Sequence, residues 1–361
     1  MNGKFLITIV KLMSTVDDKR KTAIFSTKKL AVAFLFVVSV AGANSQTNNE
    51  HSLRPSDGYA YSDGWLYSCE NDNNHYSFYR VRLSDLKKEI IARNVPYTEH
   101  FVVDINRLFF SDEGLYRRRF DNNNNIPLKR VVTNVGNIID NVILFNNRLY
   151  YTQPIDNTDS RKAVYNICSI NTDGTGDKKL TGRYYESFCI YKGMIFARNG
   201  NTTEIDKLNN NGSLIDNYGE IGRGYFDVYN DCIYYLEIDY NKEISLLYKI
   251  DINTKNKQLI KGYPFTILNP IISNNHLVFN TKKQQVMNQN TNASIGFFGD
   301  ICSINLESGE LKRIYTEQLC SLFYVYNDIV YCTEFVERES DILEFQINID
   351  GTDKKRVELF R

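Results

Sequence analysis

Residues 225–235 read Tyr-Phe-Asp-Val-Tyr-Asn-Asp-Cys-Ile-Tyr-Tyr, and this stretch decides the fold. Two runs rich in apolar residues flank the pair Asn230-Asp231, whose residue types tolerate the positive φ of a tight hairpin turn. The pattern predicts two antiparallel β-strands, because β-branched and aromatic residues fit a half-buried pleated surface.

The second strand of this hairpin recurs along the chain. A polar or small residue precedes a short apolar and aromatic run each time, at intervals of roughly 40 to 50 residues, the period of a four-stranded propeller blade. The central residues of the seven copies, which we call the anchor residues, are Leu66, Leu108, Leu149, Ile195, Ile233, Leu277 and Val330. We therefore predict an all-β chain, a β-propeller of four-stranded blades over residues 55–361, with seven blades favoured and six as the alternative.

A further hairpin in several copies carries a family resemblance. It is clearest as Ile-Asn-Thr-Asp-Gly-Thr at 170–175 and Ile-Asn-Ile-Asp-Gly-Thr at 347–352. Together with the strand at 231–235, these hairpins resemble bacterial propellers of unknown function that are similar to the YWTD propeller of low-density-lipoprotein-receptor-related proteins. The nearest match to a YWTD tetrad is Phe-Phe-Ser-Asp at 109–112. The resemblance implies six blades and an interaction module without established catalysis.

Composition and motifs limit the chemistry. Lys and Arg together number 43, as do Asp and Glu, so no net field attracts nucleic acid or an anionic membrane. The sequence lacks HExxH, GxSxG, Walker and CxxC motifs, and its four histidines are scattered. We therefore predict no metal site and no cofactor. The seven cysteines are expected to be buried free thiols rather than a disulfide framework.

The first 43 residues differ from the rest. Lys28-Lys29 precede an apolar run from Leu30 to Val40, and Ala41-Gly42-Ala43 has the small-x-small pattern of a signal-peptidase site. The run is shorter than the about 20 residues that span a bilayer. We predict a signal peptide at 1–43, with an uncleaved membrane anchor as the alternative, then a linker at 44–54. The chain is expected to be exported, either secreted or attached to the cell envelope.

Alignment of the repeats brings one set of carboxylates into register. The residue nine positions before the anchor is acidic in four consecutive repeats: Asp57, Glu99, Asp140 and Glu186. This position begins the inner strand of a blade at the mouth of the central channel, where like charges repel unless a cation or basic ligand compensates them. Capping of local backbone N–H groups is the structural alternative. Connections between blades add further candidates on this rim: Tyr97, His100, Tyr184, Tyr185, Arg223 and Tyr263.

The favoured function from the sequence is a non-catalytic binding or scaffolding module. Its ligand, an unknown protein, peptide or carbohydrate, would lie over these rim residues. The alternative is a propeller glycosidase or polysaccharide lyase that uses a carboxylate pair such as Glu99 and Glu186. A purely structural role is a third possibility.

Overall fold

The structure is a computed structural model that describes residues 59–72, 75–95, 98, 100–104, 106–111, 114–120, 125–130, 139–155, 164–282, 284–287, 294–336, 341–357 and 359. They belong to the unit formed by Thr47–Arg361. The predicted export segment and linker lie outside the described residues. The described part of the chain contains no helix long and apolar enough to cross a membrane.

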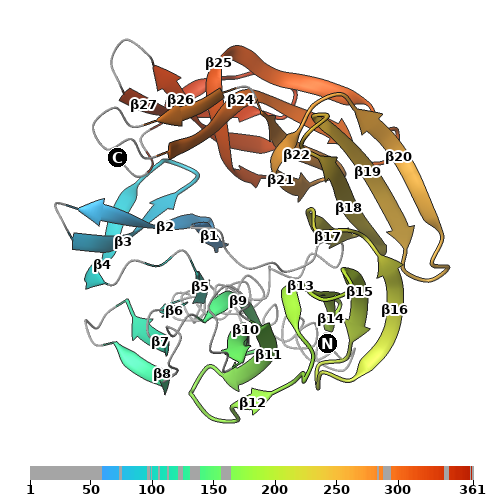
Figure 1. Cartoon of the computed structure of the whole chain (residues 1–361). Helices are drawn as coiled ribbons and strands as arrows, with labels where there is room; N and C mark the ends of the chain where they lie inside the picture. The colour runs from blue at the N-terminus through green and yellow to red at the C-terminus, as the bar shows by residue number, and fades with distance from the viewer. Residues whose placement is uncertain are drawn as a thin grey trace, which may run out of the picture. The chain divides into compact units, whose positions relative to one another are not determined.

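The strands form antiparallel sheets that follow one another in chain order (Figure 1). The first sheet contains β1 (Tyr59–Ser62), β2 (Trp65–Asp72), β3 (His75–Arg82) and β4 (Lys88–Val95). The second contains β5 (Phe101–Asp104), β6 (Arg107–Ser111), β7 (Gly114–Arg119) and β8 (Ile126–Arg130). The third contains β9 (Asp140–Phe145), β10 (Arg148–Ile155), β11 (Val164–Asn171) and β12 (Lys178–Lys179).

Two more four-stranded sheets and one larger sheet complete the described unit. The fourth sheet contains β13 (Tyr185–Tyr191), β14 (Met194–Asn199), β15 (Glu204–Leu208) and β16 (Leu214–Glu220). The fifth contains β17 (Phe226–Tyr229), β18 (Cys232–Asp239), β19 (Ile244–Asp251) and β20 (Lys257–Tyr263). The eight-stranded sheet contains β21 (Ile267–Ser273), β22 (His276–Thr281), β23 (Gln284–Met287), β24 (Ser294–Asn305), β25 (Leu311–Tyr326), β26 (Ile329–Val336), β27 (Asp341–Asn348) and β28 (Lys355–Val357).

The hairpin turns predicted from the sequence are present. Asn230 and Asp231 have φ values of 46° and 56°, as a two-residue type I′ turn requires. The same pair of positive φ values occurs in five further turns between first and second strands: Asp63-Gly64, Asn146-Asn147, Lys192-Gly193, Asn274-Asn275 and Asn327-Asp328. Asn, Asp and Gly therefore set the register of these hairpins.

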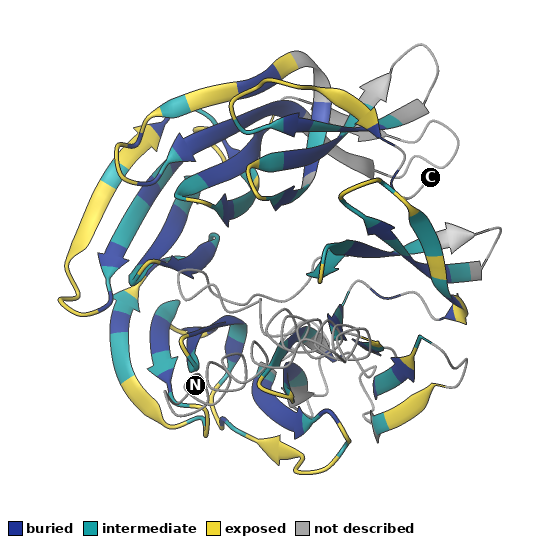
Figure 2. Cartoon of the chain, turned by 180° about the vertical axis from the view of Figure 1, so that it is seen from behind, coloured by how far each residue is buried: buried dark blue, intermediate teal, exposed yellow. Residues whose placement is uncertain are grey.

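All seven anchor residues are buried on the second strand of their sheet or half-sheet. Apolar clusters around them pack successive sheets together; Phe78 of β3, for example, meets Phe101 of β5 with ring centroids 5.0 Å apart. The last such cluster packs Leu66 and Tyr79 of the first sheet against Tyr331 of β26. The series of sheets thus closes on itself. Figure 2 shows the middle strands largely buried, the outer strand β20 mostly exposed and the outer strand β16 partly exposed.

The long strand β25 belongs to two halves of one sheet. Its residues 311–315 pair with β24, and its residues 320–326 pair with β26. The register of β25 against β24 shifts between Tyr315 and Cys320, and Cys320 pairs with both Gly299 of β24 and Glu334 of β26. The all-β architecture of four-stranded antiparallel units fits a propeller, as the sequence predicts.

Candidate functional site

A β-bulge in the fourth sheet places Glu186. Tyr185 pairs with Asn199 and Ser187 pairs with Arg198, so Glu186 is the extra residue between the two pairs. A bulge bends its strand and re-aims a side chain, and bulges are over-represented next to active sites. Glu186 thus has an unusual position near the beginning of the inner strand β13.

Two guanidinium groups face the Glu186 carboxylate. The Arg198 Nε atom lies 3.2 Å from Glu186 Oε2, and the Arg223 Nε atom lies 4.0 Å from Glu186 Oε1. The Arg198 side chain is 11% exposed and that of Glu186 is 20% exposed, whereas that of Arg223 is 74% exposed. Arg198 also donates a hydrogen bond from Nη1 to the carbonyl oxygen of Gly224. The pair of Arg198 and Glu186 is therefore held in place, and Arg223 reaches into solvent.

Tyr184 packs beside this ion pair. A Cβ atom added to Gly200 would overlap the Tyr184 ring, and the Gly200 N–H donates to the Tyr184 carbonyl oxygen at 3.1 Å. Burial raises the pKa of the Tyr184 phenol, and the Glu186 carboxylate raises it further, against the opposing effect of Arg223 and Arg198. The phenol is therefore protonated at neutral pH. We call Tyr184, Glu186, Arg198 and Arg223 the Glu186 cluster.

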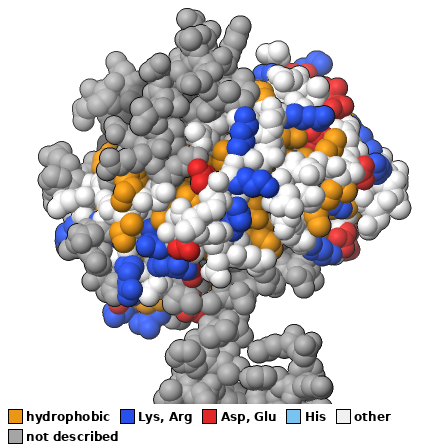
Figure 3. Space-filling view, turned by 90° about the horizontal axis from the view of Figure 1, so that it is seen from below, with side chains coloured by type: hydrophobic (Ala, Val, Ile, Leu, Met, Phe, Trp, Pro, Cys, Tyr) orange, Lys and Arg blue, Asp and Glu red, His pale blue; other side chains and the backbone are white. Residues whose placement is uncertain are grey.

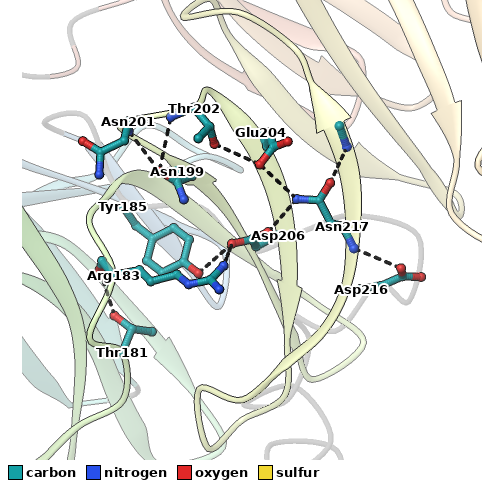
Figure 4. A network of polar contacts seen from close by, with 11 residues as sticks. Thr181, Arg183, Tyr185, Asn199, Asn201, Thr202, Glu204, Asp206, Asp216 and Asn217 are labelled. Atoms are coloured by element: carbon teal, nitrogen blue, oxygen red, sulfur yellow. Dashed lines mark hydrogen bonds and ion pairs between the residues drawn. The ribbon is translucent and has the colours of Figure 1, made fainter.

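A second carboxylate, Asp206, is buried next to the cluster. Its side chain is 1% exposed and accepts hydrogen bonds from Tyr185 Oη and Asn217 Nδ2, both at 2.8 Å. Arg183 Nη1 approaches the same carboxylate at 3.4 Å. Figure 4 shows the Tyr185 ring and the Arg183 guanidinium reaching Asp206 from one side and Asn217 from the other. Burial and then Asp206 raise the pKa of Tyr185. This carboxylate is fully engaged and serves the structure of the sheet.

The charges around Glu186 are close to balanced. In the described residues of this region, Arg183, Arg198 and Arg223 lie near Glu186 and Asp206, and Glu204 shares the Asn217 amide with Asp206. The charge of Glu186 is thus compensated from within the protein by Arg198, and no bound cation is needed for it. The face that Figure 3 shows carries both basic and acidic side chains.

The structure brings only some of the predicted rim residues together. Asp57, Tyr97, Glu99 and the side chain of Asp140 lie outside the described residues, although the backbone of Asp140 begins β9. Tyr184, Glu186 and Arg223 belong to one cluster. His100 is half-buried just before β5 in the second sheet. Tyr185 and Tyr263 are buried, and Tyr263 donates its hydroxyl to the Gly309 carbonyl oxygen at 3.0 Å.

Sequence reasoning missed Arg183, Arg198 and Asp206. One available signal was the repeated Gly-Arg pair, Gly182-Arg183 and Gly222-Arg223, in two successive connections between sheets. The partnership of Glu186 with Arg198 had no such signal, because it depends on the bulge that shifts the register. The described residues contain no group of three or more His, Cys, Asp or Glu that could hold a metal ion.

Comparison with protein families and with curated proteins finds no match. Among solved structures, a prolyl endopeptidase is similar at 10% identity, with a TM-score of 0.55, over 94% of this chain and 55% of that chain. This chain thus spans about half the length of that enzyme. An uncharacterized protein of Listeria monocytogenes is similar at 10% identity, with a TM-score of 0.51, over 86% of this chain and 95% of that one. An oligogalacturonate lyase in complex with manganese is similar at 9% identity, with a TM-score of 0.49, over 76% of this chain and 83% of that one.

These neighbours correct the favoured function. The sequence predicted a non-catalytic binding or scaffolding module, and this prediction is contradicted, because a solved structure with this architecture is a prolyl endopeptidase. The comparisons agree better with the enzyme alternative. They do not show the finer likeness to YWTD propellers. At such low identity the similarity establishes the fold alone: the chain is similar to β-propeller proteins.

Proposed function

We propose that this chain is a carbohydrate-active enzyme, a polysaccharide lyase or a glycosidase, that works at the Glu186 cluster. The observation that carries the proposal is the bulged Glu186, which lies between a buried and an exposed guanidinium and beside a protonated phenol. A carboxylate and a proton donor in one cluster are the groups that general acid–base catalysis requires. The half-buried ring of Tyr184 adds an amphipathic surface suited to a sugar.

The residues of the Glu186 cluster would have different roles in a lyase and in a glycosidase. In a lyase, Glu186 would accept the proton next to the sugar's carboxyl group, the bond to the leaving sugar oxygen would break, and Tyr184 would protonate that oxygen. In a glycosidase, Glu186 would act as nucleophile or base, and a second carboxylate would be the acid. Glu99, the partner expected from the sequence, lies outside the described residues. The product distinguishes the two, since only the lyase leaves a carbon–carbon double bond.

The test is a substitution with a matched control. We expect Glu186→Gln to lower turnover of a cleaved glycan by about 100-fold or more, the range for a lost acid–base group. Glu220→Gln is the control, because Glu220 lies on the outer strand β16 of the same sheet and is exposed. Turnover would be followed by reducing ends and by the ultraviolet absorbance of an unsaturated product. Full activity of Glu186→Gln, or no cleavage by the wild type across a panel of neutral and acidic glycans, would refute the proposal.

We also propose that the unit has seven blades, of which the sixth and seventh share β25. Support comes from the seven buried anchor residues and from the pairing of β25 with both β24 and β26. The strand would then be the outer strand of one blade and the inner strand of the next. An experimental structure with six blades would contradict this count and would favour the YWTD-type resemblance.

Export remains a proposal that rests on the first 43 residues. The apolar run and the Ala41-Gly42-Ala43 pattern support removal of a signal peptide and release outside the cell or to its envelope. The partner would then be an extracellular glycan. Mass spectrometry of the mature N-terminus tests this proposal, and a chain that keeps residues 1–43 in the cytoplasm contradicts it.

A further inference from the structure

Two connections between sheets present an arginine in the same way. Arg183 follows Gly182 and precedes β13, and Arg223 follows Gly222 and precedes β17. The side chains are 60% and 74% exposed. The two arginines are therefore exposed to solvent just before the inner strands of the fourth and fifth sheets begin.

Each of these arginines has a weak internal partner. Within the described part of the chain, Arg183 contacts Asp206 at 3.4 Å, and Arg223 contacts Glu186 at 4.0 Å. Both carboxylates have closer partners: Asp206 accepts from Tyr185 at 2.8 Å, and Glu186 lies 3.2 Å from Arg198. Most N–H donors of the two exposed guanidiniums therefore remain available for a ligand.

Another surface arginine of the same chain shows the contrast. Arg82 donates from Nε and Nη2 to the two carboxylate oxygens of Asp85, both at 2.9 Å. Such a bidentate pair uses the guanidinium fork fully. Arg183 and Arg223 have no carboxylate of this kind among the described residues. Arg82 therefore has a bidentate carboxylate partner, whereas most N–H groups of Arg183 and Arg223 are left for a ligand.

We propose that Arg183 and Arg223 bind the carboxylate groups of an acidic glycan, so that the substrate class is a polymer of uronic acid. The inference rests on the proposed function and deepens it. A planar guanidinium matches a carboxylate in a bidentate geometry. The exposed guanidinium groups favour an anionic sugar, and Tyr184 lies close enough to Arg223 and Glu186 for their charges to act on its phenol. A polymer with a carboxylate on every sugar offers a partner to each arginine, and engagement of both would strengthen binding as a multivalent contact.

The experiment measures binding of the full chain to polygalacturonate by calorimetry, with the fully methyl-esterified polymer as the uncharged match. We expect Arg183→Gln and Arg223→Gln each to weaken binding by roughly tenfold, as for loss of a charge-assisted hydrogen-bonded pair. The double variant should lose more than either single one. Arg313→Gln on β25, an exposed arginine in another sheet, is the control and should bind as the wild type does.

The outcomes separate the two proposals. Equal binding of the acidic and esterified polymers, or an unchanged double variant, overturns the uronate inference, even if Glu186→Gln abolishes cleavage of another glycan. Equal binding of dextran sulfate and polygalacturonate overturns the assignment to carboxylates. Binding of polygalacturonate that depends on both arginines, without cleavage of any glycan, supports the binding site and refutes the enzyme.

Discussion

The two ends of the sheets are built differently. At one end, which we call the turn end, a single contact repeats: the backbone N–H of the second hairpin donates to a carbonyl oxygen of the first turn. It joins Thr172 to Asn147 at 3.0 Å and Ile252 to Asp231 at 2.9 Å. The further copies are Leu83 to Gly64, Phe120 to Asn106, Leu306 to Asn275 and Ile349 to Asp328. At the turn end, this repeated hydrogen bond stabilises the fold.

The opposite end, which we call the strand-start end, changes from sheet to sheet. The pairing of first and second strands shifts by a bulge in the third and fourth sheets and is regular in the first and fifth. The bulge of the third sheet contains Asn141, whose amide donates to Thr152, whereas that of the fourth contains the charged Glu186. The comparison shows that the repeated contacts of the turn end stabilise the architecture, whereas the bulge of the fourth sheet places a carboxylate beside two arginines.

A glycine at the turn end should give the largest effect on stability. Gly212 has a φ of 84°, and an added Cβ would overlap the Leu180 carbonyl group, so backbone has to move. We expect Gly212→Ala to lower the free energy of unfolding by about 2–4 kcal/mol. Urea titration checks this, with Gly182→Ala as the control, because a Cβ there meets nothing within 4 Å. Equal midpoints for the two variants would show that the turn end tolerates change.

The second largest effect on stability is expected from alkaline pH, which should destabilise the turn end. Tyr218 and Tyr263 donate their hydroxyls to hairpin carbonyl oxygens of the following sheet, those of Ile252 and Gly309, and burial raises the pKa of each phenol to about 12. The unfolded chain ionises near pH 10, so stability is intact below pH 10 and is lost as the pH rises toward 12. The loss is about 1.4 kcal/mol per pH unit for each tyrosine.

Urea midpoints at pH 9, 10 and 11 measure this dependence. A chain with both Tyr218→Phe and Tyr263→Phe is less stable at pH 9, because two hydrogen bonds are lost, and its stability should fall less steeply with pH. An identical slope in the double variant would assign the alkaline loss to other groups.

A glycine at the strand-start end should affect stability least and function most. Gly200 lacks a left-handed φ, and the atoms nearest to a Cβ there belong to the Tyr184 side chain, which can turn away, and not to backbone. We expect Gly200→Ala to change the free energy of unfolding by less than about 1 kcal/mol and to lower glycan turnover by roughly tenfold. Tyr184→Phe is the companion variant, since it keeps the ring and removes only the proton. If Gly200→Ala proves as unstable as Gly212→Ala, the distinction between the two ends fails.

The repeated parts of the molecule were predictable from the sequence. The anchors and the Asn-Asp and Asn-Asn turns are local signals, because residue type alone decides which positions accept a positive φ or burial. The burial of the cysteines also followed expectation, since five of the seven are buried. Burial raises the pKa of the Cys69 thiol to about 11, as expected for a packed side chain.

The site was less predictable, since it depends on long-range register. Glu186 was found by aligning the repeats, but the sequence does not show that a bulge turns it toward Arg198. Tyr185 was expected on the rim as an aromatic residue, yet its hydroxyl binds the buried Asp206, which a count of apolar residues does not reveal. The continuous β25 was also unexpected, because the sequence marks no difference between a strand end and a strand that runs on.

The apolar cluster that joins the first sheet to β26 can form only late in synthesis. Leu66 and Tyr79 are made before their buried neighbours Tyr331, Val357 and Leu359. Synthesis proceeds from the N-terminus, so the apolar face of the first sheet stays uncovered until these later residues have emerged from the ribosome. That interval, rather than the mature protein, is when the chain is most exposed to aggregation and has most use for a chaperone.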